Sequence, residues 1–377
     1  MSEKKLVPKL RFSGFDDEWK SCRLHEICNV QDGTHATPNY VDEGIPFYSV
    51  ETITSDVPPK FITLEEHQKL IKRCKPKFGD ILLTRIGTLA KSKIIDWNNE
   101  FSIYVSLALL SSIKIDNKFL NQYIKTEIYQ KEFLKRSLLL AVPQKINLKD
   151  LNETIIKYPS NNEMNKISEF LTKIDKKIEL LENKHKNYQN FKKYLMQQIF
   201  TQKLRFDFND EWKKYKLKDV LSVKSSSISI NQLEDNEGDY PLYGANGFLK
   251  NIDFCEMDVN YISIVKDGSG VGNLSYHKQN SSIVNTSQYL LPKKNFNIHF
   301  MYYLLQTLNL KKYINGSSIP HIYFKDYCIE KVDIPSLPEQ NQIGRLLLGI
   351  DKKLENLNNH IELTNDFKKS LLQQMFV

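Results

Sequence analysis

Two stretches of the chain place apolar residues at alternating steps of four and three, which is the spacing of one face of an α-helix. The first stretch has Ile167, Leu171, Ile174, Ile178 and Leu181 on this face, and the second has Ile343, Leu347, Ile350, Leu354 and Leu357. Lysine and asparagine fill many of the other positions. Each stretch is therefore predicted to be a long helix that buries one apolar stripe, as helices do in the seam of a coiled coil.

These two helices belong to an internal repeat. Residues 159–200 align without gaps with residues 335–376, and 20 of the 42 aligned positions are identical. A shorter stretch, residues 10–20, recurs with one deletion as residues 204–213. Since one amphipathic helix cannot bury its own stripe, we expect the two copies to pair antiparallel about an approximate two-fold axis. Two separate hairpins, each packed on its own domain, are the alternative.

Two segments that lie between the repeated stretches are predicted to mix strands and helices. Short β-rich runs such as 79–84 and 261–265 are bounded by turn residues, and helical stretches follow at 119–138 and 298–314. Residues 142–150 also resemble residues 319–326. We therefore predict an α+β fold in which two diverged copies of one mixed α/β domain are separated by a pair of long antiparallel helices. The predicted boundaries are 1–155 for the first domain, 156–212 for the central helix and connector, 213–331 for the second domain and 332–377 for the distal helix.

Composition places the chain among folded proteins. Its 377 residues are 41% hydrophobic and 26% charged, which suits two ordinary domains. No apolar run is long enough to span a membrane, and no apolar stretch follows the charges at the N-terminus, so we expect a cytoplasmic protein without a secretory signal. The five cysteines have neither CxxC spacing nor partner histidines at zinc-finger spacing, so we expect reduced thiols.

The charge distribution suggests a nucleic-acid partner. The net charge is +8, and residues 69–93 contain eight basic side chains against Asp80 alone. Such a stretch suits a phosphate backbone, although a solvated helix and loop face is the alternative. Loops rich in Thr, Ser, Asn, His and Tyr add side chains that can pair with base edges, although ordinary turns contain the same residue types.

These considerations select candidate DNA-binding residues in both domains. In the first domain they are Thr34, His35, Thr37, Asn39, Lys72, Arg73, Arg85, Thr88, Lys91, Gln144 and Lys145. In the second domain they are Ser225, Ser226, Ser227, Tyr243, Asn246, Lys266, Ser269, Asn273 and His321.

Motifs of the relevant enzyme classes are missing from the sequence. The closest string to the Asp/Asn-Pro-Pro-aromatic motif of adenine methyltransferases, residues 56–60, ends in lysine instead of a stacking ring. The glycine run at 268–272 lacks the Gly-Lys-Ser/Thr ending of a phosphate loop. The histidines have neither triad nor metal-site spacing. We therefore predict no catalytic residue and no metal site.

Taken in order, these features resemble the specificity subunit of a type I restriction-modification system along the whole chain. The resemblance rests on the two helices that begin with Glu-x-x-x-Ile, on residues 10–19, on Asp32-Gly33-Thr34-His35, on Gly87-Thr88, on residues 240–247 and on the glycine run at 267–272. One departure is Ala90, which stands where such a loop often has a second glycine.

The resemblance implies a non-catalytic subunit in which each target-recognition domain reads one half of a gapped, bipartite site in double-stranded DNA. It implies that the helices set the gap and bind two methyltransferase (modification) subunits, with restriction/translocase subunits added. S-adenosylmethionine, ATP and Mg are then expected in those partners, and no cofactor or membrane partner is expected for this chain. Two alternatives are a coiled-coil scaffold without sequence-specific DNA binding and a fragment of a fused methyltransferase or nuclease.

Overall fold

The computed structural model describes residues 6–55, 57–233 and 235–377, which divide into two compact units. Unit 1 comprises Met1–Leu181 and His360–Val377, and unit 2 comprises Glu182–Asn359. The two longest helices, α7 (Asn161–Phe200) and α11 (Leu337–Gln374), each contribute to both units. The compact units divide the chain within α7 and α11. This division does not test the domain boundaries expected at residues 155, 212 and 331, which stay predictions.

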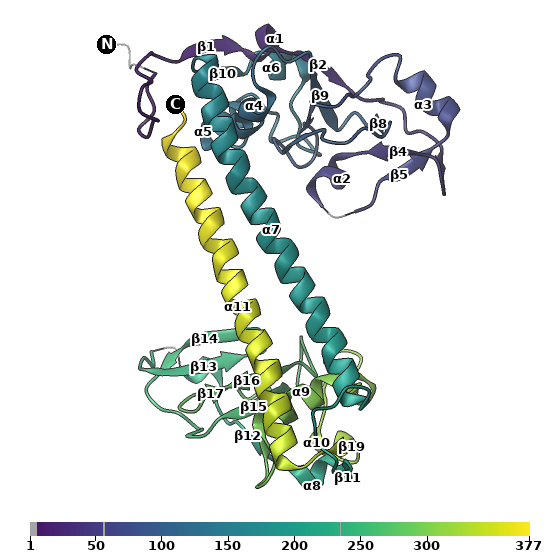
Figure 1. The fold of residues 1–377 in the computed structure, drawn as a ribbon, viewed down its shortest axis with the longest axis vertical. Coiled ribbons are helices and arrows are strands. Elements are labelled where there is room, and N and C mark those ends of the chain that lie inside the picture. Colours follow the sequence, from purple (N-terminus) through teal and green to yellow (C-terminus); the bar gives the residue numbers. More distant parts are fainter. Residues whose placement is uncertain (1–5, 56, 234) are drawn as a thin grey trace. The chain divides into compact units, whose positions relative to one another are not determined.

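Unit 1 contains a mixed α/β domain ahead of α7 (Figure 1). Its strands form one sheet in the order β2-β9-β6-β7, a second in the order β3-β5-β4-β8, and the pair β1-β10. The strands are β1 (Lys20–Arg23), β2 (Asn29–Asp32), β3 (Tyr40–Val41), β4 (Ile45–Tyr48), β5 (Lys60–Ile62), β6 (Ile81–Thr84), β7 (Ser92–Ile94), β8 (Ser102–Ile103), β9 (Leu107–Ser111) and β10 (Ile155–Tyr158). The helices are α1 (Leu24–Ile27), α2 (Val50–Thr54), α3 (Leu64–Leu70), α4 (Asn117–Ile124), α5 (Glu127–Lys135) and α6 (Leu148–Asn152).

Unit 2 contains a second mixed domain. Its sheets have the orders β12-β18-β15-β16 and β14-β13-β17, and β11 pairs with β19. The strands are β11 (Lys213–Lys216), β12 (Leu221–Ser225), β13 (Tyr240–Gly244), β14 (Gly247–Ile252), β15 (Tyr261–Val265), β16 (Leu274–His277), β17 (Ser282–Ile283), β18 (Ser287–Pro292) and β19 (Lys331–Ile334). The helices are α8 (Leu217–Val220), α9 (Ile298–Thr307) and α10 (Phe324–Tyr327), with 3-10 turns η1 (Ile230–Gln232) and η2 (Leu310–Tyr313).

The two domains share one strand topology. The sheet β12-β18-β15-β16 repeats the order and the antiparallel pairings of β2-β9-β6-β7. Strand β13 pairs antiparallel with β14 and parallel with β17, just as β4 pairs with β5 and β8. Strand β3 has no counterpart among the described residues of unit 2. The prediction that the variable segments are two diverged copies of one domain is therefore confirmed.

The helical stretches predicted at 119–138 and 298–314 are each shorter and interrupted. The first divides into α4 and α5 because the Thr126 hydroxyl accepts a hydrogen bond from the Tyr129 N–H and caps a new helix. The second ends as an α-helix at Thr307 and resumes as the 3-10 turn η2. Apolar periodicity continues across both breaks, so it did not reveal them.

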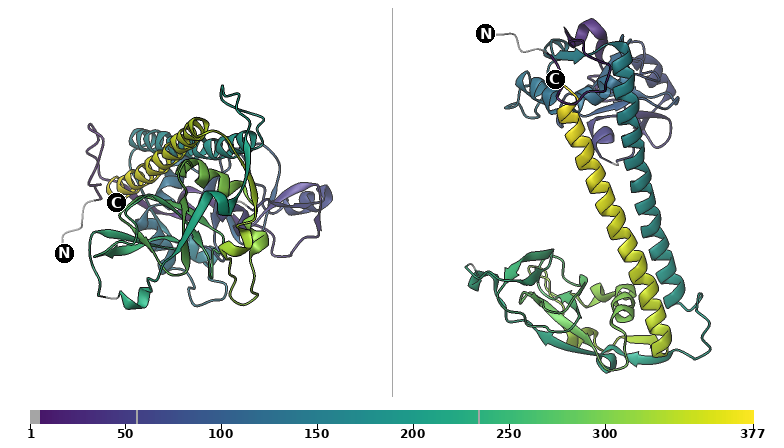
Figure 2. Two further views of the ribbon diagram at one scale, coloured as in Figure 1. Left: turned by 90° about the horizontal axis from the view of Figure 1, so that it is seen from below. Right: turned by 60° about the vertical axis from the view of Figure 1, so that its left-hand side comes forward.

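The apolar stripes of the long helices are buried within each unit, where α7 and α11 run in opposite directions (Figures 1 and 2). In unit 1, Ile167, Leu171 and Ile174 share a core with the α4 side chains and with Leu371 of α11. In unit 2, Ile343, Leu347 and Ile350 share a core with the α9 side chains and with Leu195 and Ile199 of α7. Ile178 and Leu354 lie at the edges of these cores, Leu181 is half-buried and Leu357 is buried.

Each stripe thus packs on its own domain as well as on the opposing helix. The predicted coiled-coil seam accounted for only part of this burial. The remainder is supplied by α4 and α9, whose buried faces include Phe119 and Phe300.

Polar contacts repeat across the two units at equivalent positions. Arg11 donates to Glu163 at the start of α7 with 2.8 Å contacts, and Arg205 donates to Glu339 at the start of α11 at 2.8 and 3.1 Å. The two glutamates open the Glu-x-x-x-Ile pattern with which each helix begins. They are also buried ion-pair partners that join the entry segment of each domain to its helix.

Candidate DNA interface

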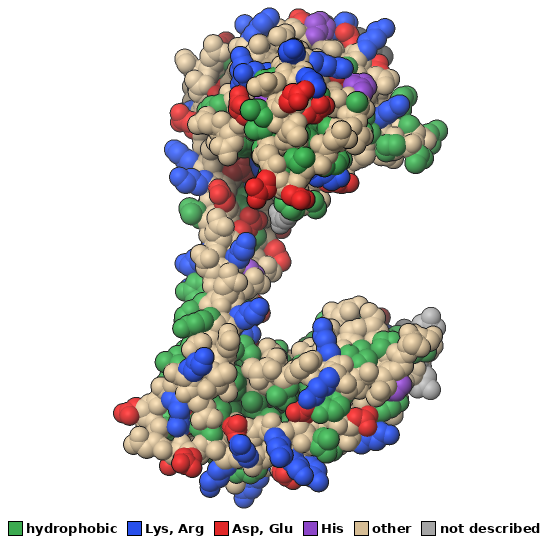
Figure 3. All heavy atoms as spheres, turned by 90° about the vertical axis from the view of Figure 1, so that its right-hand side faces the viewer, with side chains coloured by type: hydrophobic (Ala, Val, Ile, Leu, Met, Phe, Trp, Pro, Cys, Tyr) green, Lys and Arg blue, Asp and Glu red, His purple; other side chains and the backbone are tan. Residues whose placement is uncertain are grey.

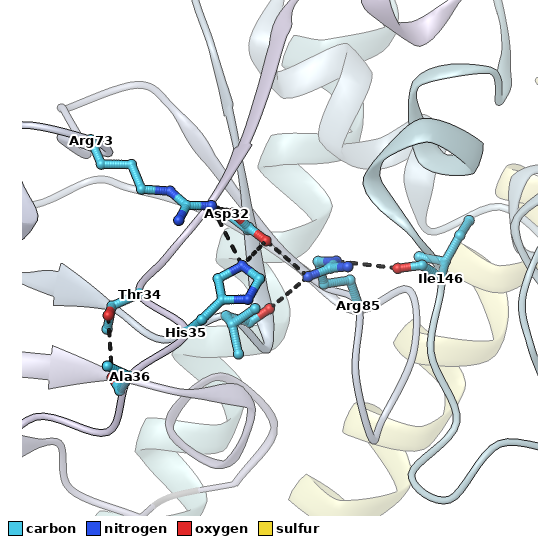
Figure 4. Close-up of polar contacts among 8 residues, drawn as sticks. Asp32, Thr34, His35, Ala36, Arg73, Arg85 and Ile146 are labelled. Atoms are coloured by element: carbon cyan, nitrogen blue, oxygen red, sulfur yellow. Dashed lines mark hydrogen bonds and ion pairs between the residues drawn. The ribbon is translucent and has the colours of Figure 1, made fainter.

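A polar cluster in unit 1 is centred on the buried carboxylate of Asp32. This residue ends β2, and its side chain is 3% exposed. Arg73 donates to Oδ1 at 2.6 Å, and Arg85, which follows β6, donates to Oδ2 at 3.1 Å. His35 Nε2 lies 3.0 Å from the same Oδ2 (Figure 4). One carboxylate therefore orients two arginines, one of them at the end of a central strand, and a histidine.

The backbone at Gly33 makes this arrangement possible. A Cβ atom on Gly33 would lie 1.9 Å from the Ile103 carbonyl oxygen, so only glycine permits this approach. The Thr34 N–H also donates to that oxygen. The Asp-Gly-Thr-His sequence is thus a tight junction that fixes where the following loop begins.

Arg85 is buried among polar groups of its own domain. Its side chain is 7% exposed, and it donates to the carbonyl oxygens of Val105 at 3.0 Å and Ile146 at 3.2 Å as well as to Asp32. Burial lowers the pKa of Arg85, and the Asp32 charge opposes that shift. The sequence placed Arg85 among DNA-binding residues, but its contacts give it a structural role within the loop cluster.

The equivalent position in unit 2 has different chemistry. Strand β12 ends at Ser225, which pairs with the second residue of β18, just as Asp32 pairs with the second residue of β9. Lys266 follows β15 as Arg85 follows β6, and its ammonium lies 3.6 Å from the Asp267 carboxylate. Ser226, which directly follows Ser225, is buried, and its hydroxyl donates to the Ile283 carbonyl at 2.6 Å. Ser226, a candidate DNA-binding residue from the sequence, is therefore also buried.

Unit 2 also contains an aromatic cluster at the start of β15, the end of that strand away from Lys266. His277 stacks on Tyr261 with ring centroids 4.9 Å apart, and its centroid lies 4.5 Å from that of Tyr243. Its Nε2 lies 2.8 Å from the Ser263 hydroxyl. Burial lowers the pKa of His277 to about 4, so the ring is neutral at pH 7. Tyr243 is half-buried in this cluster, and no sequence pattern pointed to His277.

The loops after β6 and β15 have matching geometry despite the alanine in one of them. The Ala90 N–H donates to Thr84 O and the Gly272 N–H donates to Val265 O, so these residues are equivalent. Both have positive φ, 57° for Ala90 and 85° for Gly272. Ala90 therefore adopts the left-handed conformation of the glycine that it replaces, at a cost that glycine does not carry.

The remaining predicted residues are mostly accessible. Those exposed are His35, Thr37, Asn39, Lys72, Arg73, Thr88, Lys91, Gln144, Ser225, Ser227, Asn246, Ser269 and Asn273. Those half-buried are Thr34, Lys145, Tyr243, Lys266 and His321. Lysine and arginine are spread over the visible faces of the units among acidic side chains, without one continuous basic surface (Figure 3).

The loop cluster of unit 1 also borders a cavity of about 340 Å³. Aromatic side chains of Tyr40, Phe47 and Tyr104 line it, together with Gly87 of the loop after β6. The Lys60 ammonium lies 4.4 Å from the centroid of the Tyr40 ring at this site. Phe47, Lys60 and Tyr104 were not among the candidate residues, because an aromatic in or beside a short strand looks like any core residue.

The described residues contain neither a membrane-spanning helix nor a cluster of metal ligands. No helix in residues 6–55, 57–233 and 235–377 is long and apolar enough to cross a membrane. The same residues contain no group of three or more His, Cys, Asp and Glu side chains placed to hold a metal ion.

A duplicated mixed domain, with one strand frame and two different loop clusters, defines a protein with two related but non-identical binding surfaces. The family described as type I restriction modification DNA specificity domain matches residues 16–188 and 209–365. The chain belongs to this family.

Individual relatives are similar over part or all of the chain. The type I restriction enzyme MjaVIII specificity subunit of Methanocaldococcus jannaschii is 28% identical over 182 residues, which cover 44% of this chain and 42% of the relative. A putative type I specificity subunit of Mycoplasma genitalium is 24% identical over 288 residues, which cover 72% and 73%. A crystal structure of a type I restriction-modification S subunit from M. genitalium covers 98% of this chain and 99% of its own, with 19% identity and a TM-score of 0.71. That last likeness shows a shared fold.

Proposed function

We propose that this chain is the non-catalytic DNA specificity subunit of a type I restriction-modification complex. Each domain reads one half of a gapped, bipartite site, and the repeated helices set the spacing between the halves. S-adenosylmethionine, ATP and Mg belong to the partner subunits in this proposal.

One observation carries the proposal: equivalent loop positions differ in chemistry while the strands beneath them match. Asp32 and Ser225 are the last residues of the equivalent strands β2 and β12. Arg85 and Lys266 directly follow the equivalent strands β6 and β15. A domain that served only as a scaffold would not need different polar groups at these positions. Two readers of different half-sites would need them, because base edges are distinguished by donors and acceptors.

Methylome sequencing of a host that carries this chain with its methyltransferase subunit tests the proposal. We expect a gapped motif with modified adenine on both strands. Exchange of residues 21–155 for another family member's first domain is expected to change one half of the motif and leave the other unchanged. A change in both halves, or modification without a motif, would contradict independent reading.

Two methyltransferase subunits are expected to bind the helices through exposed apolar residues that the repeat duplicates. Phe191 of α7 and Phe367 of α11 are equivalent in the repeat and are 50% and 54% exposed. Exposed phenylalanines at repeated helix positions suit anchors of a partner interface. They support one binding site for the same partner in each unit.

Replacing each phenylalanine in turn tests this partner assignment. Phe191→Ser is expected to reduce the bound methyltransferase from two copies to one, as is Phe367→Ser, and the double variant is expected to bind none. Native mass spectrometry of the assembled complex measures the stoichiometry. Ile329→Ser is the matched control because Ile329 is 57% exposed and lies outside both helices. Two bound copies in the double variant would place the interface elsewhere.

A further inference from the structure

Two loops project aliphatic side chains into solvent at equivalent places in the two domains. In unit 1, Leu140 is 99% exposed and Val142 is 100% exposed. In unit 2, Ile319 is 67% exposed. Single exposed apolar residues are ordinary, but neighbours such as Leu140 and Val142 form an exposed apolar patch of the kind that marks an interaction site.

The backbone contacts show that these loops correspond. Loop 139–144 is closed by the pair Leu138 and Lys145, whose N–H and C=O groups bond to each other, and loop 316–320 is closed in the same way by Asn315 and His321. Loop 139–144 is one residue longer than loop 316–320. The feature is thus part of the duplicated frame.

Each loop is tied to the candidate DNA-binding loop of its own domain. The Gly87 N–H donates to Gln144 O at 2.8 Å, and the Gly268 N–H donates to Pro320 O at 2.9 Å. Ile86 and Asp267 form β-bridges to Lys145 and His321. The aliphatic tips therefore have fixed positions beside the polar loops after β6 and β15.

The chain segments that carry both loops are net positive. Residues 131–150 contain five lysines and arginines against Glu132 and Asp150, and residues 311–326 contain three lysines, one of them paired with Glu330, against Asp326. An apolar tip with a basic surround matches a nucleic-acid groove, whose phosphates line an opening onto base pairs.

We propose that loops 139–144 and 316–320 enter a groove of the DNA and pack Leu140, Val142 and Ile319 on apolar atoms of base pairs. This inference rests on the proposed function and adds the residues that make its apolar contacts. The loop of unit 1 offers a larger apolar tip than that of unit 2, because Leu138 and Leu139 are also exposed there. The two domains therefore differ in apolar as well as in polar contacts.

The test uses the assembled methyltransferase complex and a duplex that carries its methylated motif. Binding is measured by fluorescence anisotropy over a range of salt concentrations for Leu140→Ser with Val142→Ser, and separately for Ile319→Ser. We expect each loop variant to bind roughly tenfold more weakly, about the cost of a mismatched base pair. The slope of log affinity against log salt should not change, because no phosphate contact is lost. Lys145→Gln should instead lower that slope by about one.

Controls separate the possible outcomes. Leu64→Ser and Ile329→Ser, at residues 55% and 57% exposed outside these loops, should bind as the unaltered complex does. Unchanged affinity in the loop variants would overturn the inference, and so would loss of the methyltransferase subunits, which would make the loops a protein contact. If the unaltered complex itself does not prefer its motif over a scrambled duplex, the proposed function fails independently of the loops.

Discussion

The polar loops of unit 1 and unit 2 begin at equivalent strand ends but are held by different interactions. In unit 1 the buried Asp32 carboxylate holds Arg73, His35 and Arg85. In unit 2 Ser225 takes the place of the carboxylate, and Lys266, at the position of Arg85, lies 3.6 Å from the Asp267 carboxylate. The joints between domain and helix, by contrast, are the same Arg–Glu pair in both units. The repeat has therefore been kept at the joints and has diverged at the loops.

Removing the arginine of a joint is expected to have the largest effect on stability. Arg11→Met leaves Glu163, which is 1% exposed, without its charged partner and should lower the free energy of unfolding by about 3 kcal/mol. Arg205→Met should cost less, because Arg205 is 24% exposed and Trp212 Nε1 still donates to Glu339 at 3.4 Å. Urea unfolding measures both.

A surface ion pair provides the control for the joints. Arg23 is 60% exposed beside Glu153, so Arg23→Met should change the free energy of unfolding by less than about 1 kcal/mol. If Arg11→Met were as mild as Arg23→Met, the joint would not be a stabilising feature of the repeat.

The second largest effect on stability is expected at the polar loops, where it should differ between unit 1 and unit 2. Asp32→Asn keeps an acceptor oxygen but removes the charge that pairs with buried Arg85, so we expect a loss of about 2 kcal/mol and weaker recognition of the first half-site only. Methylation of duplexes altered in one half-site at a time measures the effect. Ser225→Ala is the matched change in unit 2 and should leave stability nearly unchanged, because Ser225 is exposed. Equal effects of both changes on both half-sites would contradict separate readers.

Sequence reasoning predicted the architecture well because the repeat is a long-range signal. The identical positions in residues 159–200 and 335–376 predicted two equivalent helices, and the related closing segments predicted two copies of one domain. The loop residues were chosen by type alone. Arg85 and Ser226 have the polarity of DNA-binding residues, but backbone carbonyls of neighbouring segments accept their hydrogen bonds.

What the sequence could not supply was the contact partner of each polar group. Asp32 was noticed as part of a motif, yet its role depends on Arg73 and Arg85, which are 41 and 53 residues away. The exposed tip at Leu140 and Val142 was also missed, because an apolar run after a helical stretch suggests core packing. Burial, which decides between these interpretations, depends on tertiary structure.

Acidification should affect unit 2 through His277. Its pKa of about 4 in the folded state lies below the ordinary value of 6.5, so the unfolded chain binds the proton first. Above about pH 6.5 the ring is neutral in both states and the free energy of unfolding is at its full value. As the pH decreases towards 4, this free energy falls by up to about 3 kcal/mol. The expected result is a urea midpoint that decreases over this range.

Unit 1 provides the control for this titration. Ile95 occupies the position equivalent to His277, and Leu82 the position equivalent to Ser263, by the pairing of β6 with β7 and of β15 with β16. His277→Ile combined with Ser263→Leu should remove this part of the pH dependence. A profile that stayed the same in the double variant would assign the acid sensitivity to other groups.

The smallest effects are expected where the domain, α7 and α11 meet at one carboxylate in each unit. Asp175 pairs with Lys368 and accepts from Gln122 at 2.6 Å, and Asp351 pairs with Lys192 and accepts from Tyr303 at 2.6 Å. The aspartates are 36% and 31% exposed, so Asp→Asn at either should cost about 1 kcal/mol or less, and less again in high salt.

Exchanging the charges of one pair tests whether the two helices are coupled through it. Asp175→Lys with Lys368→Asp should recover part of the stability that either single change removes, as a double-mutant cycle measures. In unit 1 the new lysine can donate to Gln122 Oε1 once the side-chain amide turns over. The same exchange at Asp351 and Lys192 leaves the Tyr303 hydroxyl free to rotate and accept a hydrogen bond from the new lysine, so similar recovery is expected in both units. No recovery in either unit would mean that the helices are not coupled through these pairs.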